Sequence, residues 1–212
     1  MDKHFHLQFP NLGFVGAELS EEDLKPIRDE VEEVSKNFDS ARTLNERLVG
    51  HIRKEFTLQK SHAHLEQLAL QLAYSFRVAH HFADPSVDDL FMVGSWVNFQ
   101  KKHEFNPVHN HDGEYVFVIW LNVPYNIEDE MNMFPDIPKR NNRAGHFAFQ
   151  YIDSLGHILP WTIPADKTYE GKMILFPASM NHEVHPFYTS DEYRISVAGN
   201  LHVKPGREST YK

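Results

Sequence analysis

The chain has 212 residues, of which 41% are hydrophobic and 13% aromatic, enough to fill the core of one domain. Its formal net charge of −9 argues against nucleic acid or an anionic membrane as a partner, because phosphates would be repelled. The absence of cysteine excludes disulfides and thiolate metal sites. The N-terminus does not resemble a signal peptide, and no apolar run approaches the roughly 20 residues of a membrane span. We therefore expect a soluble, cytoplasmic protein.

The first predicted element is a short strand at residues 5–9, where apolar and polar residues alternate. An amphipathic helix is predicted over 20–36, because apolar residues recur there at steps of three and four. Either Ser20 or Asp23 could cap this helix. Pro26 favours Asp23, since proline is tolerated in a first turn but not deeper in a helix.

Residues 37–60 give an ambiguous pattern, with turn residues but no clear period. A second, longer helix is predicted to begin at Ser61 and to stop before 84–86, an Asp-Pro-Ser sequence. Its apolar stripe consists of Leu65, Leu68, Leu72, Phe76 and Ala79. Residues 1–88 are thus expected to form a mainly helical N-terminal part.

From Leu90 onward the hydrophobic period changes to two, which is typical of strands. Within 96–100, Trp96, Asn98 and Gln100 are expected to share one face of a strand, opposite two apolar residues. Further strands are predicted at 115–123, 147–151, 158–163, 173–176 and 193–203.

Short strands separated by turns that contain proline or glycine are typical of a sandwich or jelly roll. We expect an α+β, mainly β, single domain over 1–212, with a β core at 89–204 and the N-terminal helices packed on a sheet. Residues 124–145 are long for a connection and lack periodicity, so they form either a functional loop or a mobile one.

A candidate metal site begins with His109 and His111, which flank a single residue just before a predicted strand. Residues i and i+2 of an extended chain point to the same side, so both imidazoles can bind one ion. His182 can supply a third ligand, and neutral imidazole suits Fe(II). The common non-haem iron triad has a carboxylate at the position of His111, so Asp112 is the reserve ligand.

Arg194 and Ser196 are expected to share one face of a later strand. A guanidinium fork and a hydroxyl placed together can hold a carboxylate through charge-assisted hydrogen bonds. The alternative is that Arg194 forms an ordinary ion pair with an acidic residue at the surface.

Together these motifs resemble the Fe(II)/2-oxoglutarate-dependent oxygenase superfamily, and within it the prolyl-hydroxylase-like proteins of bacteria and phages. The matching stretches are Asn-Pro-x-His-x-His-x-Gly at 106–113, Leu-Phe-Pro ending in His at 175–182, and Arg-Ile-Ser at 194–196. The resemblance covers about 93–203. It implies a cupin-like double-stranded β-helix that binds iron at one open end, in a bacterial cell or a phage-infected host.

The resemblance also implies a reaction: 2-oxoglutarate and O2 bind at Fe(II), and decarboxylation to succinate is coupled to hydroxylation of another substrate. The three histidines and Arg194 are then the catalytic residues. The far carboxylate of 2-oxoglutarate would meet Arg194 and Ser196. Asn98 and Gln100 are candidates for further hydrogen bonds to it, or else ordinary polar residues of a strand. The substrate, a small molecule or a protein, and the oligomeric state are left open.

Two other functions compete with this interpretation. A cupin-like three-histidine dioxygenase or isomerase that needs no 2-oxoglutarate explains His111, but leaves Arg194 and Ser196 without a role. A non-enzymatic jelly-roll binding protein, with structural or zinc-bound histidines, predicts no turnover of 2-oxoglutarate.

Several other residues receive structural interpretations. His185 is expected to point away from the metal ligands. The basic residues at 139–143 form either a solvated face or a recruitment site for an acidic substrate. Trp96, Phe117 and Trp120 are predicted to belong to the core rather than to contact a substrate.

Overall fold

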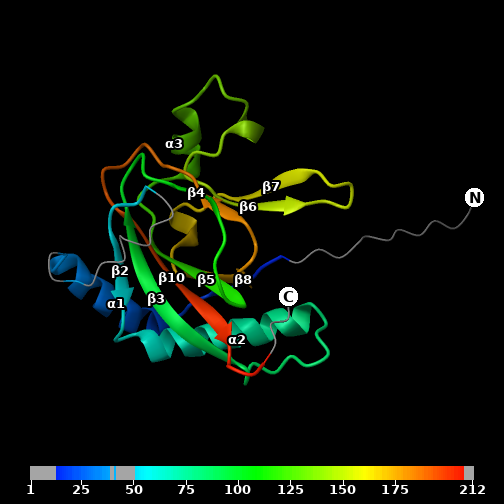
Figure 1. The fold of residues 1–212 in the computed structure, drawn as a ribbon. Helices are drawn as coiled ribbons and strands as arrows, with labels where there is room; N and C mark the ends of the chain where they lie inside the picture. Colours follow the sequence, from blue (N-terminus) through cyan, green and yellow to red (C-terminus); the bar gives the residue numbers. More distant parts are fainter. Residues whose placement is uncertain (1–12, 39–40, 42–50, 208–212) are drawn as a thin grey trace, which may run out of the picture.

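Two antiparallel β-sheets form the framework of the computed structural model, which describes residues 13–38, 41 and 51–207 (Figure 1). The larger sheet contains, in spatial order, β1 (Val15–Glu18), β8 (Lys172–Pro177), β5 (Tyr115–Asn122), β10 (Arg194–Val203), β3 (Leu90–Gln100) and β2 (Glu55–Leu58). The smaller sheet contains β4 (Asn106–His109), β9 (His182–Val184), β6 (Phe147–Ile152) and β7 (Ile158–Ile163). The prediction of a mainly β jelly roll is confirmed. The strand predicted at 5–9 lies outside the described residues.

The two long helices, α1 (Glu21–Lys36) and α2 (His62–Ala79), lie against the outer face of the larger sheet (Figure 1). Three short helices lie in connections: α3 (Ile127–Asn132), η2 (Lys139–Asn141) and η3 (Lys167–Tyr169). The N-terminal part also contributes β1 and β2, the two edge strands of the larger sheet. The helical part and the β core therefore share one sheet.

Helix α1 begins with a capping box, and its N-cap is Ser20 rather than Asp23. The Asp23 backbone N–H donates to the Ser20 hydroxyl at 3.1 Å, while the Ser20 backbone N–H donates to the Asp23 carboxylate at 3.1 Å. Two N–H groups that the helix leaves unpaired are satisfied in this way. The preference for Asp23 as the cap was wrong, because Pro26 is accommodated inside the helix.

A buried carboxylate joins α1 to the start of α2. Glu30 is 7% exposed and accepts backbone N–H groups of Gln59, Lys60 and Ser61 at 2.7 to 2.8 Å, as well as the Ser61 hydroxyl at 2.6 Å. Burial alone would raise the pKa of Glu30, but these hydrogen bonds outweigh it and hold the pKa below its ordinary value. Glu30 therefore stays ionised at the N-terminus of α2, where negative charge is favoured.

Alternation along the strands divides the larger sheet into an apolar outer face and an inner face that is partly polar. Val97 and Phe99 of β3 share one face, as predicted, and are buried against the helices. Between the sheets, aromatic and aliphatic residues of β5, β6 and β8 fill one half of the space. Polar residues of β2, β3 and β10 face the other half, which remains open as a cavity.

The connection at 124–145 contains α3 and η2 and is tied to the rest of the fold. Glu130 has no exposed surface and accepts the backbone N–H groups of Tyr188 at 2.7 Å and Thr189 at 2.9 Å. Asn142 donates to the Met131 carbonyl oxygen at 2.9 Å. These contacts anchor the connection at 124–145 to the rest of the fold. Whether this loop has a function stays a prediction.

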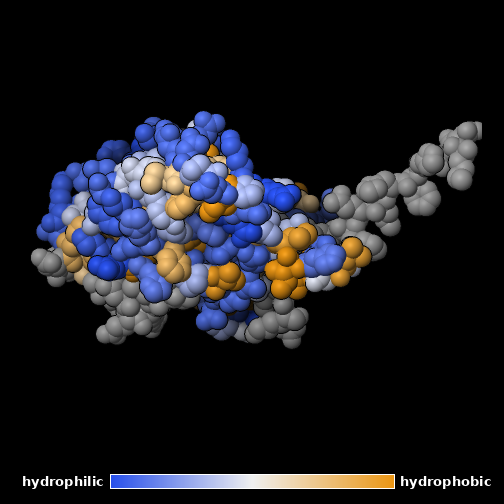
Figure 2. All heavy atoms as spheres, turned by 90° about the horizontal axis from the view of Figure 1, so that it is seen from above, coloured by the Kyte–Doolittle hydropathy of each residue, from blue (hydrophilic) through white to orange (hydrophobic). Residues whose placement is uncertain are grey.

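The face of the molecule seen in Figure 2 is mostly hydrophilic, with a hydrophobic group of atoms toward the right of the view. Large exposed apolar side chains gather on the β6–β7 hairpin: Ile152, Leu155, Ile158 and Trp161. No helix in the described part of the chain is long and apolar enough to cross a membrane.

Candidate metal centre

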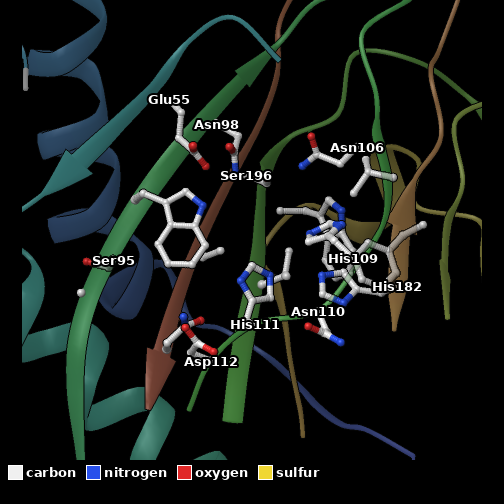
Figure 3. Close-up of a pocket in the computed structure, with 18 of the residues that line it drawn as sticks. Glu55, Ser95, Asn98, Asn106, His109, Asn110, His111, Asp112, His182 and Ser196 are labelled. Atoms are coloured by element: carbon white, nitrogen blue, oxygen red, sulfur yellow. The ribbon is translucent and has the colours of Figure 1, made fainter. Parts of the chain in front are cut away.

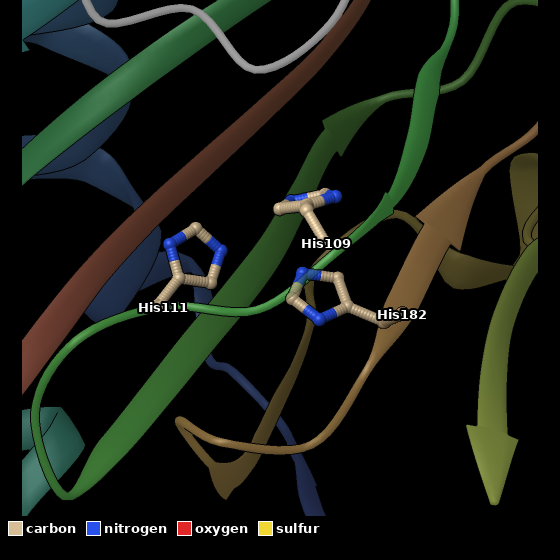
Figure 4. A group of neighbouring side chains, drawn as sticks. All are labelled: His109, His111 and His182. Atoms are coloured by element: carbon tan, nitrogen blue, oxygen red, sulfur yellow. The ribbon is translucent and has the colours of Figure 1, made fainter.

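The candidate centre lies where β4 and β9 pair, and the pairing sets His109 directly opposite His182. Side chains that are opposite each other on neighbouring antiparallel strands lie close together. His111 joins them from just beyond β4, and one ring nitrogen of each residue lies within 4.8 Å of one ring nitrogen of each of the others (Figure 4). The three residues predicted as metal ligands therefore come together in space.

His111 lies outside β4 and is positioned by the turn that precedes β9. Its backbone N–H donates to the Ala178 carbonyl oxygen at 2.9 Å. The neighbouring Asn110 donates its side-chain N–H to the Asn181 side-chain oxygen at 3.1 Å. These two bonds hold the imidazole 5.1 Å from each of the other two rings, centroid to centroid.

The hydrogen bonds of two imidazoles decide which nitrogen can bind a metal. Nδ1 of His109 lies 2.7 Å from the Pro107 carbonyl oxygen, and Nδ1 of His182 lies 3.0 Å from that of Met180. A carbonyl oxygen only accepts, so each Nδ1 carries the proton and each Nε2 keeps a free lone pair. Second-sphere bonds of this kind orient histidine ligands in metal sites.

Burial keeps the cluster uncharged. It lowers the pKa of His109, and it lowers the pKa of His111 to about 4 and that of His182 to about 3, with smaller contributions from the neighbouring imidazoles. All three rings are therefore neutral near pH 7. Three neutral imidazoles with open space beside them suit a borderline divalent ion such as Fe(II), so the donor set fits the implied metal.

The reserve ligand, Asp112, is not part of the cluster. Its side chain is exposed at the edge of the cavity, and the chain bends at Gly113, whose φ is +108°. A Cβ at Gly113 would lie 2.7 Å from the Leu201 carbonyl oxygen, so this bend requires glycine. The predicted bend exists, but it does not bring the carboxylate among the imidazoles.

The imidazoles open into a cavity of about 570 Å³ between the two sheets (Figure 3). Arg194, Ser196 and Asn98 line the same cavity. Trp96 and Trp120 line it as well. Trp120 is 3% exposed and belongs to the core, as predicted, whereas Trp96 is only half-buried, so its assignment to the core was wrong. Phe117 is fully buried on the outer face of the sheet, as predicted.

Arg194 is 3% exposed, and all five of its N–H groups have acceptors within the protein. Nε and Nη2 donate to the Gln100 side-chain oxygen at 3.1 and 2.5 Å, and Nη1 donates to the Tyr125 hydroxyl at 2.6 Å. The carbonyl oxygens of Gly145 and His185 accept the remaining N–H groups at 3.2 Å. The alternative of a surface ion pair does not hold for Arg194, which is a buried charge with neutral partners.

The other residues predicted to meet 2-oxoglutarate divide into two kinds. Gln100 does not line the cavity; it holds Arg194, and its Nε2 donates to the Glu104 carbonyl oxygen. Asn98 and Ser196 are cross-strand partners in the wall of the cavity. Asn98 is 8% exposed, and its side-chain oxygen has no partner among the described residues. Asn98 and Ser196 therefore remain able to bond a ligand.

His185 points away from the cluster, as predicted: its Nε2 lies 3.3 Å from a carboxylate oxygen of Glu183. Arg143 lies 3.4 Å from the same oxygen, so it is paired within the fold. Lys139 and Arg140 are exposed. The basic stretch thus separates into one paired residue and two solvated ones.

Sequence reasoning missed the contribution of β2, whose residues alternate between polar and apolar. Glu55 and Thr57 line the cavity, whereas the two apolar residues of β2 are buried beneath the helices. Asn106 and Asn200 also line it, each with a buried side-chain oxygen that lacks a partner among the described residues. The period of two was the available signal, but four residues are too few to distinguish a strand.

The sequence matches a model for the 2OG-Fe(II) oxygenase family over residues 94–200, just over half of the chain. The matched region runs from β3 to β10 and contains the three histidines and Arg194. Among curated proteins, no sequence matches the chain.

Solved structures share the fold at low sequence identity. A prolyl-4-hydroxylase from Pseudomonas putida is 14% identical, with a TM-score of 0.54 over 91% of this chain and 94% of its own. AviO1 from Streptomyces viridochromogenes is 11% identical, with a TM-score of 0.56 over 93% and 92%. HygX from Streptomyces hygroscopicus, solved with nickel, 2-oxoglutarate and hygromycin B, is 11% identical, with a TM-score of 0.51 over 92% and 84%.

The fold and the sequence match therefore point to the same family. The family uses Fe(II), 2-oxoglutarate and O2, and the imidazole cluster suits such a metal. This chain belongs to the 2OG-Fe(II) oxygenase family.

Proposed function

We propose that the protein is an Fe(II)- and 2-oxoglutarate-dependent dioxygenase that hydroxylates a substrate held in the cavity between the sheets. The observation that carries the proposal is that the three imidazoles open into the same cavity as Arg194, Ser196 and Asn98. A metal site and groups that suit a carboxylate thus face one space.

The chain itself would bind and orient the reactants. His109 and His182 would hold iron through Nε2, because their Nδ1 atoms are already bonded to the backbone. His111 would complete the ligand set. The chemistry supplied by bound Fe(II) is activation of O2 coupled to decarboxylation of 2-oxoglutarate to succinate and CO2. Apolar side chains in the cavity wall, such as Trp120 and Phe147, would help to exclude water from the reacting groups.

Ser196 and Asn98 would make the direct hydrogen bonds to the far carboxylate of 2-oxoglutarate. Arg194 would act mainly through its charge, because its N–H groups are already bonded. A cation held in a dry, preformed cradle attracts a carboxylate more strongly than the same cation in water.

The test is an anaerobic titration of Fe(II)-loaded protein with 2-oxoglutarate, followed by the weak visible charge-transfer band of the chelate. We expect the band in the wild type and weaker 2-oxoglutarate binding in Ser196→Ala. Ser75→Ala, an exposed serine on α2, is the matched control and should behave as the wild type. Absence of the band from iron-loaded wild type would contradict the proposal.

Arg194→Ala is also expected to weaken 2-oxoglutarate binding. The substitution would also leave four buried acceptor groups without their hydrogen-bond donor. Folding of the variant must therefore be checked by circular dichroism before the titration is interpreted.

A second candidate, a three-histidine dioxygenase that does not use 2-oxoglutarate, is favoured by one observation. Every N–H group of Arg194 already has an acceptor in the protein, so the fold accounts for this residue without a co-substrate. The same titration separates the two functions, because the second candidate binds iron but forms no chelate band.

A further inference from the structure

One carboxyl group in the cavity takes no part in the proposed reaction. Glu55 lies on β2, opposite Asn98 of β3, and Thr57 on the same face lies opposite Trp96. All four residues line the cavity. Figure 3 shows Glu55 and Asn98 on one side of the pocket, with His109 and His182 across from them. Glu55 thus faces the metal centre from the opposite sheet.

The carboxyl group of Glu55 has no hydrogen bond and no ion pair with any residue that the structure describes. The basic side chain nearest in sequence, Lys54, lies instead over the ring of Phe38, with its Nζ 3.8 Å from the ring centroid. The N–H groups of Arg194 are all bonded to other residues. The Thr57 hydroxyl oxygen beside Glu55 is buried and also lacks a partner among the described residues.

An unpaired carboxyl group in a cavity destabilises the folded protein unless a ligand binds it. Burial raises the pKa of Glu55 to about 7, and no hydrogen bond or positive charge of the described chain offsets this effect. Polar groups in protein interiors are normally paired, so unpaired ones that line a cavity are free to bind a ligand there. A partner that carries positive charge and donates hydrogen bonds would offset the cost of burial and favour the ionised carboxylate.

Trp96 narrows the chemistry of that partner. Its ring lies 5.7 Å from the ring of His111, so the indole extends from the strand beside β2 toward the metal centre. An indole face attracts cations, and a carboxylate adds charge-assisted hydrogen bonds. Asp112, at the rim of the same cavity, is a further source of negative charge.

We propose that Glu55, together with Thr57 and Trp96, forms the substrate-recognition end of the cavity and binds an ammonium or guanidinium group. The inference rests on the proposed function, since it takes the cavity as the place where a substrate is oxidised. A cationic group held on Glu55 would present a neighbouring C–H bond to the metal centre. The substrate class is therefore a cationic amine or guanidine.

The test measures binding of agmatine, which carries both an ammonium and a guanidinium group, to zinc-loaded protein by saturation-transfer NMR. The uncharged 1,5-pentanediol serves as the neutral probe. We expect agmatine to bind the wild type, and to bind Glu55→Gln at least about tenfold more weakly, while the diol does not distinguish the two proteins. Trp96→Leu should also weaken agmatine binding.

The matched control is Glu18→Gln, the same substitution on β1, at the opposite edge of the same sheet and exposed. It should bind agmatine as the wild type does. Glu55→Gln loses no described partner, so it should fold normally, which a thermal melt verifies. Equal agmatine affinity in the wild type and Glu55→Gln, or no binding by the wild type, would overturn the inference.

Measuring the chelate band in the same proteins distinguishes failure of this inference from failure of the proposed function. If the chelate band forms in the wild type and in Glu55→Gln, but the two proteins bind agmatine equally well, only the recognition site is refuted. If agmatine binding depends on Glu55 but no band forms, the cation site stands and the oxygenase function fails.

Discussion

At the residue scale, the three imidazoles are not held with equal firmness. His182 is 3% exposed, and its Nδ1 is bonded to a backbone carbonyl, as is that of His109. The ring of His111 has no hydrogen bond among the described residues and is positioned through its backbone N–H. His109 and His182 therefore form the preorganised pair, which His111 completes.

The first prediction compares two nearby histidines. His182→Ala should lower metal affinity by more than about 100-fold, because even an outer hydrogen-bond partner contributes ~10–100-fold. His185→Ala is the control, since this residue faces Glu183 rather than the cluster. Equilibrium dialysis with Co(II) measures both, and equal affinities would refute the assignment of the centre.

The second prediction concerns Glu55 and pH. Its folded-state pKa, about 7, lies above the ordinary value of 4.5, so between these values the folded state binds more protons than the unfolded state. The stability that Glu55 contributes therefore falls as pH rises through this range. The melting temperature of Glu55→Gln relative to the wild type should rise from pH 4.5 to about 7 and then level off. A difference that does not change with pH would contradict this.

At the element scale, buried carboxylates connect segments that are far apart in the sequence. Glu30 ties α1 to the first turn of α2, and Glu130 ties α3 to the backbone at Tyr188 and Thr189. Each accepts N–H groups that would otherwise be buried without partners. Hydrogen bonds to a charged group are worth more than neutral ones, so these contacts are important for stability.

The third prediction compares a buried carboxylate with an exposed one on the same helix. Glu30→Ala should lower the free energy of unfolding by about 3 kcal/mol, because it leaves backbone N–H groups near Ser61 without an acceptor. Glu33→Ala removes only an exposed ion pair with Lys60 and should cost much less, because surface ion pairs contribute little to stability. Urea unfolding measures both, and similar losses would contradict the role given to Glu30.

At the scale of the whole molecule, residues of both sheets line the cavity that contains the metal centre. The metal-facing imidazoles come from the smaller sheet and its adjoining loop, while Arg194, Ser196 and Glu55 come from the larger one. A ligand that bridges the cavity would connect the two layers. A ligand that binds only the folded state stabilises it by an amount that grows with the logarithm of free ligand concentration over Kd.

The fourth prediction follows from the lowered pKa values of the cluster. His111 and His182, with pKa values of about 4 and about 3 against an ordinary 6.5, stay neutral in the folded protein well below pH 6. The stability of the neutral cluster is therefore present above pH 6.5 and is lost as pH falls toward these values. Zinc should raise the melting temperature at pH 6 nearly as much as at pH 7.5, and the gain should vanish toward pH 4. His182→Ala should show no gain at either pH.

Local pattern was enough to predict much of the molecule. Alternation predicted both faces of β3 and the bounds of β7, and apolar spacing predicted the long helices. The spacing of His109 and His111 and the Arg-x-Ser motif indicated the metal cluster and the wall of the cavity. These features depend on residues that are close together in the chain, where periodicity and side-chain chemistry suffice.

Only the tertiary structure decided the remaining features. The strands β4 and β9 have four and three residues, too few for a period to be seen, and they exist because they pair with each other. The exclusion of Asp112, the capture of Arg194 by Gln100 and Tyr125, and the arrival of Glu55 opposite Asn98 all depend on contacts between distant segments. The sequence by itself determined which chemical groups were available, whereas long-range strand pairing decided which of them share one cavity, because such pairing depends on the whole sheet rather than on neighbouring residues.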